Sequence, residues 1–178
     1  MIQTPSQTVG PFFGLGLIRA GCNVLVSPRT SGERIRIEGT VFDGAGQRVD
    51  DALVEIWQAD ARGRYRQDPQ FPGFGRCGTD SSGRFVFDTI KPGAPDAPGG
   101  HPAAPHINVI VFARGMLVHA FTRIYFSDDR LDADSLLETV EAARRKTLVA
   151  TRTDTPTGVV YQWDVHLQGE RETVFFDA

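Results

Sequence analysis

The sequence predicts a mainly β fold: an antiparallel β-sandwich with long loops, an extended N-terminal arm and one short helix. Three observations predict it. Short segments alternate apolar and polar residues with the period of two that a half-buried strand requires. Turns rich in glycine and aspartate separate these segments. Only one segment has the apolar spacing of three or four residues that is typical of a helix.

The 178 residues are enough for one domain with a sizeable core. We expect residues 1–33 to form the arm and a connecting segment, and residues 34–178 to form the sandwich. With 40% hydrophobic residues, 23% charged residues and a net charge of -3, the composition is ordinary for a globular protein. This balance argues against a basic surface for nucleic acid or an anionic membrane.

The chain shows neither a secretion signal nor a run of about 18 apolar residues, so we expect a cytoplasmic location. The two cysteines, Cys22 and Cys77, lie far apart without a metal-type spacing. In such a compartment both are expected to be reduced thiols.

Residues 4–17 combine two prolines and three glycines, a density that opposes a helix. A solvated tail would expose four large apolar side chains in or near this segment, those of Phe12, Phe13, Leu15 and Leu17. We therefore expect an extended arm that buries these groups against its own domain or against another chain.

Six strands are expected, at residues 35–41, 53–58, 85–87, 107–113, 122–126 and 159–168. The segment 107–113 is apolar on both faces, which indicates a fully buried strand. Turns that tolerate positive φ, at residues 43–46 and 80–83, separate the first three strands.

Two segments interrupt this pattern. Residues 91–105 hold five prolines and predict a long loop, and loops of that length inside a compact domain are often functional. Residues 135–149 place apolar side chains three or four apart, with capping-box spacing from Ser135 to Glu138 and basic residues near the far end. This segment is the predicted helix.

A metal site needs several donors that converge on one point, and a His-x-His on a strand is the best local device because residues two apart share a face. Here the segment contains His106 and Asn108, and an amide oxygen is a poor ligand for a transition metal. The most plausible metal motif is therefore incomplete. Of the other histidines, His119 and His166 are expected to be structural, and His101 to face solvent.

Seven segments, in order along nearly the whole chain, resemble intradiol ring-cleaving dioxygenases. Within that family they are similar to the iron-free α-type subunits of the enzymes that cleave protocatechuate. The segments are 4–12 (TPSQTVGPF), 53–60 (LVEIWQAD), 74–76 (FGR), 89–93 (TIKPG), 104–108 (APHIN), 112–115 (FARG) and 168–177 (QGERETVFFD). Seven ordered segments form a far more specific signal than any one of them.

The resemblance implies that the metal-bearing chains hold Fe(III) with two tyrosinates and two histidines. The first tyrosine has no counterpart here, because residues 66–74 contain none and Tyr65 matches a non-ligand tyrosine better. The second is replaced by Ala94-Pro95, and Asn108 replaces one histidine, so His106 is the only clear remnant. Because Fe(III) needs phenolate donors, we expect no metal in this chain and Fe(III) in a partner β subunit.

The resemblance further implies a hetero-oligomer in which this chain completes the β subunit's substrate pocket at the α–β interface. That enzyme would use O2 to cleave protocatechuate to 3-carboxy-cis,cis-muconate, and this chain alone would be inactive. By the same resemblance Thr8, Gly10, Pro11 and Arg114 border the substrate, and Arg114 is suited to pair with the substrate carboxylate.

Simpler interpretations stay open for these residues. Arg114 precedes Gly115 and would then be an exposed turn residue, and the arm would dock without touching substrate. Arg123 is expected in an interface ion pair, and core or interface packing explains Trp57 and Trp163. Two other functions also stay open: a non-catalytic transthyretin-like β-sandwich module, and a self-sufficient metalloenzyme that uses the four histidines. The iron content of the purified chain separates the last of these from the others.

Overall fold

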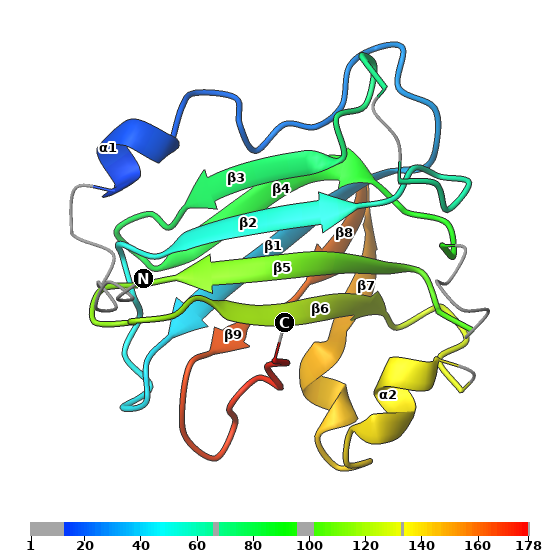
Figure 1. Ribbon diagram of the computed structural model, residues 1–178. Coiled ribbons are helices and arrows are strands. Elements are labelled where there is room, and N and C mark those ends of the chain that lie inside the picture. The colour runs from blue at the N-terminus through cyan, green and yellow to red at the C-terminus, as the bar shows by residue number, and fades with distance from the viewer. Residues whose placement is uncertain (1–12, 66–67, 96–101, 133, 178) are drawn as a thin grey trace, which may run out of the picture.

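The computed structural model describes residues 13–65, 68–95, 102–132 and 134–177 (Figure 1). Its strands are β1 (Arg34–Phe42), β2 (Leu53–Gln58), β3 (Phe74–Gly78), β4 (Arg84–Ile90), β5 (His106–Phe112), β6 (Ala120–Phe126), β7 (Val149–Thr155), β8 (Gly158–Gln162) and β9 (Val165–His166). The helical elements are α1 (Phe13–Leu17), α2 (Ser135–Thr139) and the 3-10 turn η2 (Arg145–Leu148). None of the described helices is long and apolar enough to cross a membrane.

The strands follow the order β3-β2-β5-β6-β7-β8-β1-β4, with β9 beside β1. Figure 1 shows β3, β2, β5 and β6 as a front layer that lies over β1, β4 and β8. The layers are joined where β6 meets β7, through only two residue pairs. The sheet therefore turns over on itself, and the main hydrophobic core fills the space between its two halves.

The mainly β fold class is confirmed, but the strand pairing is mixed and not purely antiparallel. β1 runs parallel to β8 and β9, and β6 runs parallel to β7. All other ladders are antiparallel. Apolar periodicity predicts that a strand exists and which face is buried, but it carries no information about the direction of the partner.

The helices differ from the sequence prediction. Residues 13–17 form the short helix α1, although the glycines in this segment predicted an extended chain. The predicted helix 135–149 divides into α2 and η2, and Val149 begins β7. Asp134 caps α2 by accepting the backbone N–H groups of Leu136 and Leu137, and the extended backbone of Val140 ends it. Helical spacing alone did not show this interruption.

The predicted strands are present with small shifts at their ends, and two strands were missed. β3 was not predicted because two of its five residues are glycine. β7 was not predicted because it is rich in threonine and charged residues and lacks an apolar alternation. The predicted strand 159–168 divides into β8 and β9 around a buried Trp163. Gly39 allows this, because a Cβ at that position would lie 1.8 Å from the carbonyl oxygen of Trp163.

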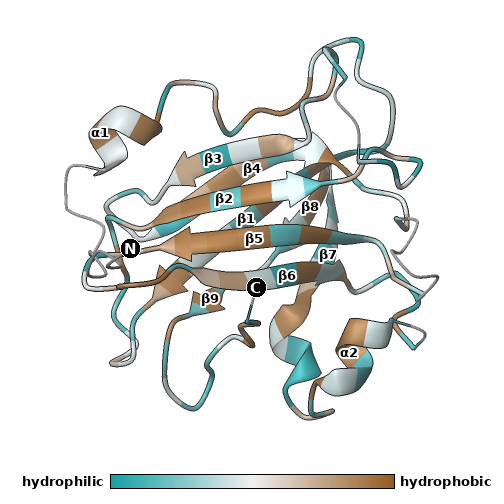
Figure 2. Cartoon of the chain, viewed as in Figure 1, coloured by the Kyte–Doolittle hydropathy of each residue, from teal (hydrophilic) through white to brown (hydrophobic). Residues whose placement is uncertain are grey.

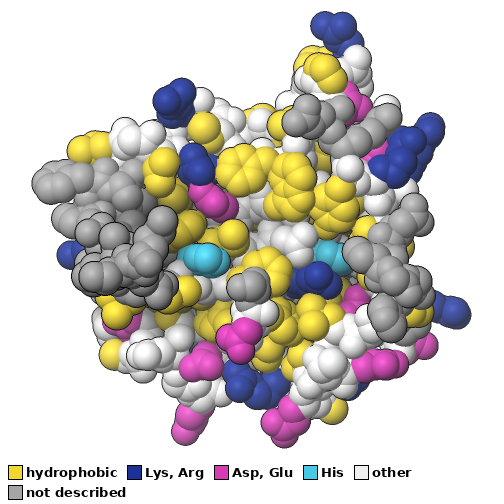
Figure 3. Space-filling model, in the orientation of Figure 1, with side chains coloured by type: hydrophobic (Ala, Val, Ile, Leu, Met, Phe, Trp, Pro, Cys, Tyr) yellow, Lys and Arg dark blue, Asp and Glu magenta, His cyan; other side chains and the backbone are white. Residues whose placement is uncertain are grey.

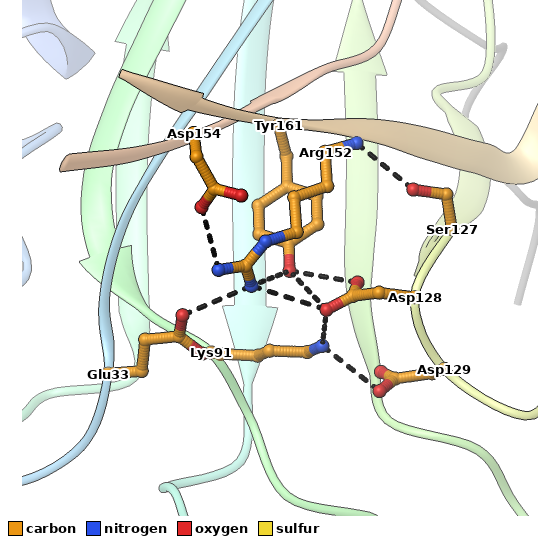
Figure 4. Close-up of polar contacts among 8 residues, drawn as sticks. All are labelled: Glu33, Lys91, Ser127, Asp128, Asp129, Arg152, Asp154 and Tyr161. Carbon is orange, nitrogen blue, oxygen red and sulfur yellow. Dashed lines mark hydrogen bonds and ion pairs between the residues drawn. The ribbon is translucent and has the colours of Figure 1, made fainter. Parts of the chain in front are cut away.

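A polar network ties the two layers together where β4 ends (Figure 4). The Lys91 ammonium bonds Asp128 at 2.7 Å and Asp129 at 3.0 Å. Arg152 on β7 bridges Glu33 and Asp128 at 3.1 and 3.3 Å. Burial lowers the pKa of Lys91, but the hydrogen bonds to the two carboxylates outweigh it and the pKa is raised. The network thereby anchors the start of the loop at residues 91–105, whose described part has no helix or strand.

Candidate functional site

Alternate side chains of β5 point to opposite sides of the front layer. Ile107, Val109 and Val111 are fully buried in the core. His106, Asn108, Ile110 and Phe112 therefore project from the outer face, as the period of a strand requires. Figure 2 shows β5 as hydrophobic along most of its length and hydrophilic near its start. The prediction that His106 and Asn108 share a face is confirmed.

Cross-strand register arranges the outer face of the front layer in two rows. One row contains Phe74, Trp57, Asn108 and Arg123, in that order across β3, β2, β5 and β6. The next row contains Arg76, Glu55, Ile110 and Phe121. A hollow of about 420 Å³ lies over these rows, which we call the Trp57 hollow. Figure 3 shows this face, with hydrophobic side chains gathered over the strands and basic and histidine side chains among them.

The Asn108 amide is engaged at both ends. Its Nδ2 donates to the Tyr65 hydroxyl at 3.0 Å, and its Oδ1 accepts from Arg123 Nε at 3.1 Å. The ring of Tyr65 in turn stacks on Trp57, with centroids 6.0 Å apart. Among the described residues, no carboxylate forms an ion pair with Arg123. Within the described chain Arg123 is held by this hydrogen bond to Asn108, and the ion pair with another chain stays a prediction.

His106 is only 4% exposed, and its ring is held by a contact to the residues just before β5. Its Nδ1 lies 2.8 Å from the carbonyl oxygen of Ala104, so this nitrogen carries the proton and donates it. Its ring lies against Tyr125, with centroids 5.8 Å apart. Burial, with the nearby Arg123 charge, lowers the pKa of His106 to about 4. His106 is therefore neutral at pH 7, in the tautomer that metal-ligating histidines adopt.

Asp134 organises the layer that covers His106. One carboxylate oxygen accepts the Tyr125 hydroxyl at 3.1 Å, and the other accepts the Ala104 N–H at 2.8 Å. The same carboxylate caps α2 through Leu136 and Leu137. Burial is the main reason that the pKa of Tyr125 is raised, so its phenol stays protonated and donates. Asp134 thus links α2, the end of the long loop and β6.

The residues at the family's ligand positions do not fit ferric iron. His106 offers one imidazole nitrogen, and both ends of the Asn108 amide are already bonded. Burial raises the pKa of Tyr65, which keeps its hydroxyl in the neutral form, whereas a ligand would be a phenolate. The Arg123 cation beside Asn108 would repel a metal ion. Within the described ranges, no three His, Cys, Asp or Glu side chains gather as a metal site.

Arg114 lies at the opposite end of β5, in a turn made with Gly115, whose φ is +82°. It lies six positions along the chain from Asn108, four of them within β5, a span of at most about 20 Å at the usual strand rise. Its guanidinium pairs with the carboxylate of Asp51, and 64% of its side chain is exposed. The three predicted arm residues Thr8, Gly10 and Pro11 lie outside the described residues.

Exposed apolar side chains gather at this end of the front layer. The start of β2 pairs with the ends of both β3 and β5, which brings α1 and the β5–β6 turn to the same edge. A Cβ on Gly78 at the end of β3 would lie 2.4 Å from the Ile18 side chain, so the segment after α1 packs here. The exposed apolar residues of this edge are Leu15, Leu17, Ile18, Leu117 and Val118. We call this edge the Arg114 end.

The two tryptophans and the histidines lie in different surroundings. Trp57 is 42% exposed on the outer face, so it contributes to a surface and not to the core, whereas Trp163 is buried. The sequence of β2 already indicated the surface position of Trp57. Val54 and Ile56 are two apart and share the buried face, so Trp57, the next residue, lies on the opposite face. The histidines His119 and His166 pack against aromatic rings, on Phe112 and Phe42 respectively. His101 lies outside the described residues.

Comparison with known proteins gives consistent similarities. A family model described as Dioxygenase matches residues 24–169. The protocatechuate 3,4-dioxygenase alpha chain of Burkholderia cepacia is 47% identical, over 99% of this chain and 98% of that protein. The beta chain from the same organism is 38% identical, over 85% of this chain and 71% of its own length. A solved dioxygenase domain from Streptomyces sp. SirexAA-E, part of a carbohydrate-binding fusion, aligns with a TM-score of 0.66 and 27% identity, covering 83% of this chain and 87% of that chain.

Proposed function

Because the chain belongs to the intradiol dioxygenase family, we propose that it is the iron-free α subunit of a protocatechuate 3,4-dioxygenase. Its partner is a catalytic β subunit, and the partner holds Fe(III). The similarity to an alpha chain over almost the full length of both proteins supports this role. It also argues against a transthyretin-like binding module, because such modules do not account for the arm or the Phe112–Gly115 segment.

The observation that carries the proposal is the state of Asn108. Its amide stands where a second histidine would ligate, and it is bonded to Tyr65 and to the Arg123 cation. A chain with this arrangement has to obtain the metal chemistry from elsewhere. In the partner, bound Fe(III) supplies activation of the catecholate ring toward O2. This argument also disfavours a self-sufficient metalloenzyme that would use His106 together with the remaining histidines.

What this chain contributes is binding at the interface. Arg114 projects from the Arg114 end, and Asp51 holds one side of its guanidinium while the rest stays exposed. A guanidinium in this position suits the ring carboxylate of protocatechuate, whose burial without a partner would be costly. The exposed Leu117 and Val118 beside it provide apolar surface for the partner. We assign Thr8, Gly10 and Pro11 of the arm to the same pocket wall.

Coexpression with the β chain tests this function. The complex should contain iron and consume O2 with protocatechuate to give 3-carboxy-cis,cis-muconate, while this chain purified alone should do neither. Arg114→Gln should leave complex formation intact and raise KM for protocatechuate by at least tenfold, which corresponds to about 1.4 kcal/mol. Arg84→Gln is the matched control, because Arg84 is also an exposed, ion-paired arginine but lies on the other layer.

Two results would contradict the proposal. The first is stoichiometric iron and ring cleavage by this chain alone, which would make it a complete enzyme. The second is an unchanged KM in a fully assembled Arg114→Gln complex, which would leave Arg114 as a turn residue. Fractionation of cells that express both chains tests the cytoplasmic location that we propose along with this function.

A further inference from the structure

We propose that a small pocket between the turn before β1 and the loop after β2 binds a phosphoryl group, either as inorganic phosphate or as the end group of a small phosphorylated molecule. Its volume of about 210 Å³ lies below the usual range for drug-sized ligands, which favours a small group. Three arginines of these two segments line it, Arg29, Arg62 and Arg64. Its described lining residues do not include Arg114 or the residues at the family's ligand positions. The free chain carries this pocket, so the inference does not depend on the proposed function.

The turn before β1 forms one wall of the pocket and is held by the side chain of Thr30. The Thr30 hydroxyl accepts the Ser27 N–H at 2.9 Å and donates to the Gln70 carbonyl oxygen at 2.5 Å. Figure 1 shows this turn and the loop between β2 and β3 at the same end of the sandwich. Thr30 is buried, so its two hydrogen bonds fix the backbone from which Arg29 projects. The Arg29 side chain is exposed, and its guanidinium has no partner in the described part of the chain.

The loop after β2 forms the opposite wall and is organised by Asp60. One oxygen of the Asp60 carboxylate accepts the backbone N–H groups of Arg62 and Arg64, at 2.8 and 3.0 Å. The other oxygen accepts two hydrogen bonds from the Arg64 guanidinium, at 3.2 and 3.0 Å. The charge of Arg64 is thereby offset within the loop. Arg62 is exposed, and among the described residues its guanidinium has no partner.

The charges and donors of the lining favour a phosphoryl group. Its described side chains include three guanidinium groups and two carboxylates, those of Asp60 and Asp68, which leaves one positive charge in excess. Arg29 and Arg62 each offer a planar fork of N–H donors, a geometry that matches the oxygens of a phosphoryl group. The Ser31 hydroxyl also lines the pocket and adds a neutral donor. A phosphoryl group has enough oxygens to accept from both walls at once, whereas chloride offers no such oxygens.

Calorimetric titration of the purified full-length chain with inorganic phosphate, in a chloride buffer held at constant ionic strength, tests this site. Phosphate should bind and saturate at millimolar concentration. Arg29→Gln and Arg62→Gln should each weaken phosphate binding about tenfold, because each removes one charged donor. Arg29→Lys, which keeps the charge without the fork, should give an intermediate affinity. Arg84→Gln is the matched control, because Arg84 is an exposed arginine outside the pocket, and it should bind phosphate like the unchanged chain.

Titration with glycerol phosphate distinguishes the two sources of the phosphoryl group. Binding as tight as that of inorganic phosphate, or tighter, assigns the pocket to phosphorylated small molecules. Weaker binding assigns it to the free ion, because the ester then meets a pocket wall. In both cases Arg29→Gln should weaken the binding.

The proposal is overturned if phosphate shows no saturable binding to the unchanged chain at millimolar concentration. It is also overturned if a folded chain with both Arg29→Gln and Arg62→Gln keeps full affinity, since the heat would then come from another place on the surface. Should that double variant fail to fold, as judged by circular dichroism, the single variants and Arg29→Lys decide the question. These readouts use binding to the iron-free chain, so they are independent of the O2 uptake that tests the proposed function.

Discussion

The side chains at the two ends of β5 differ in burial and in the contacts that they make within the chain. At its start, His106 is 4% exposed and bonded to Ala104, and Asn108 uses both ends of its amide. At its finish, Arg114 has one surface partner and stands beside exposed leucine and valine side chains. At the start of β5 the polar groups of His106 and Asn108 are therefore satisfied by contacts within the chain. At the Arg114 end, by contrast, polar and apolar groups remain exposed and available for contact with a partner.

This difference predicts that the contacts at the start of β5 contribute to the free energy of unfolding. Asp134→Ala should lower the free energy of unfolding by about 3 to 5 kcal/mol, because it removes a helix cap and leaves the buried Tyr125 hydroxyl and Ala104 N–H without an acceptor. Urea denaturation measures this change. The exposed Asp132→Ala serves as control and should stay within about 0.5 kcal/mol. A loss below 1 kcal/mol for Asp134→Ala would show that the contacts at the start of β5 do not stabilise the fold.

A smaller effect is the loss of unfolding free energy at low pH that His106 causes. The pKa of His106 is about 4 in the folded chain and about 6.5 in an unfolded chain, so the unfolded state binds more protons in between. Its contribution is therefore fully present above pH 6.5 and is lost as the pH falls toward 4. At pH 4.5 the loss should be about 2 kcal/mol, and His106→Gln should remove this part of the pH dependence. The exposed His119→Gln is the control variant, and an equal slope in both variants would contradict the assignment.

At the other end, changes should affect pairing and not folding. Leu117→Asp should leave the unfolding free energy of the isolated chain within about 0.5 kcal/mol, because this side chain is exposed. It should raise the Kd for the β chain at least tenfold, about 1.4 kcal/mol, by placing a charge in an apolar contact. Val24→Asp, at an exposed apolar position away from this end, is the control. Analytical ultracentrifugation of the mixed chains measures the difference.

The smallest expected effect tests how Arg114 is positioned. Asp51→Asn removes the carboxylate that pairs with its guanidinium, and a surface ion pair of this kind contributes little to stability. We expect unfolding within about 0.5 kcal/mol of the unchanged chain. In the assembled enzyme KM for protocatechuate should rise about threefold, since a freer guanidinium binds the carboxylate less well. A KM that stays constant here while Arg114→Gln raises it would show that Arg114 needs no positioning.

Much of the fold could be predicted from residue patterns. Alternation along β1 predicted a strand with a buried face, because one-sided burial imposes a period of two on the side chains. The segment 107–113 is apolar on both faces and predicted a fully buried strand, whereas in β5 Asn108, Ile110 and Phe112 are only partly buried. The helix at 135–149 was only partly right, because an aspartate cap and an extended valine divide a segment whose spacing remains helical throughout. Strands β3 and β7 depend on their neighbours and had no clear local signal.

By itself, the sequence determined which donors are missing. Asparagine at 108, and alanine with proline at 94 and 95, stand where the resemblance implies a histidine and a tyrosine, and residue identity alone shows this because coordination depends on side-chain chemistry. Only the tertiary structure decided what replaced it. Register brings Asn108 between Trp57 and Arg123, residues that are far apart in the chain. That neighbourhood arises from strand pairing, which is non-local and leaves no trace in any single segment.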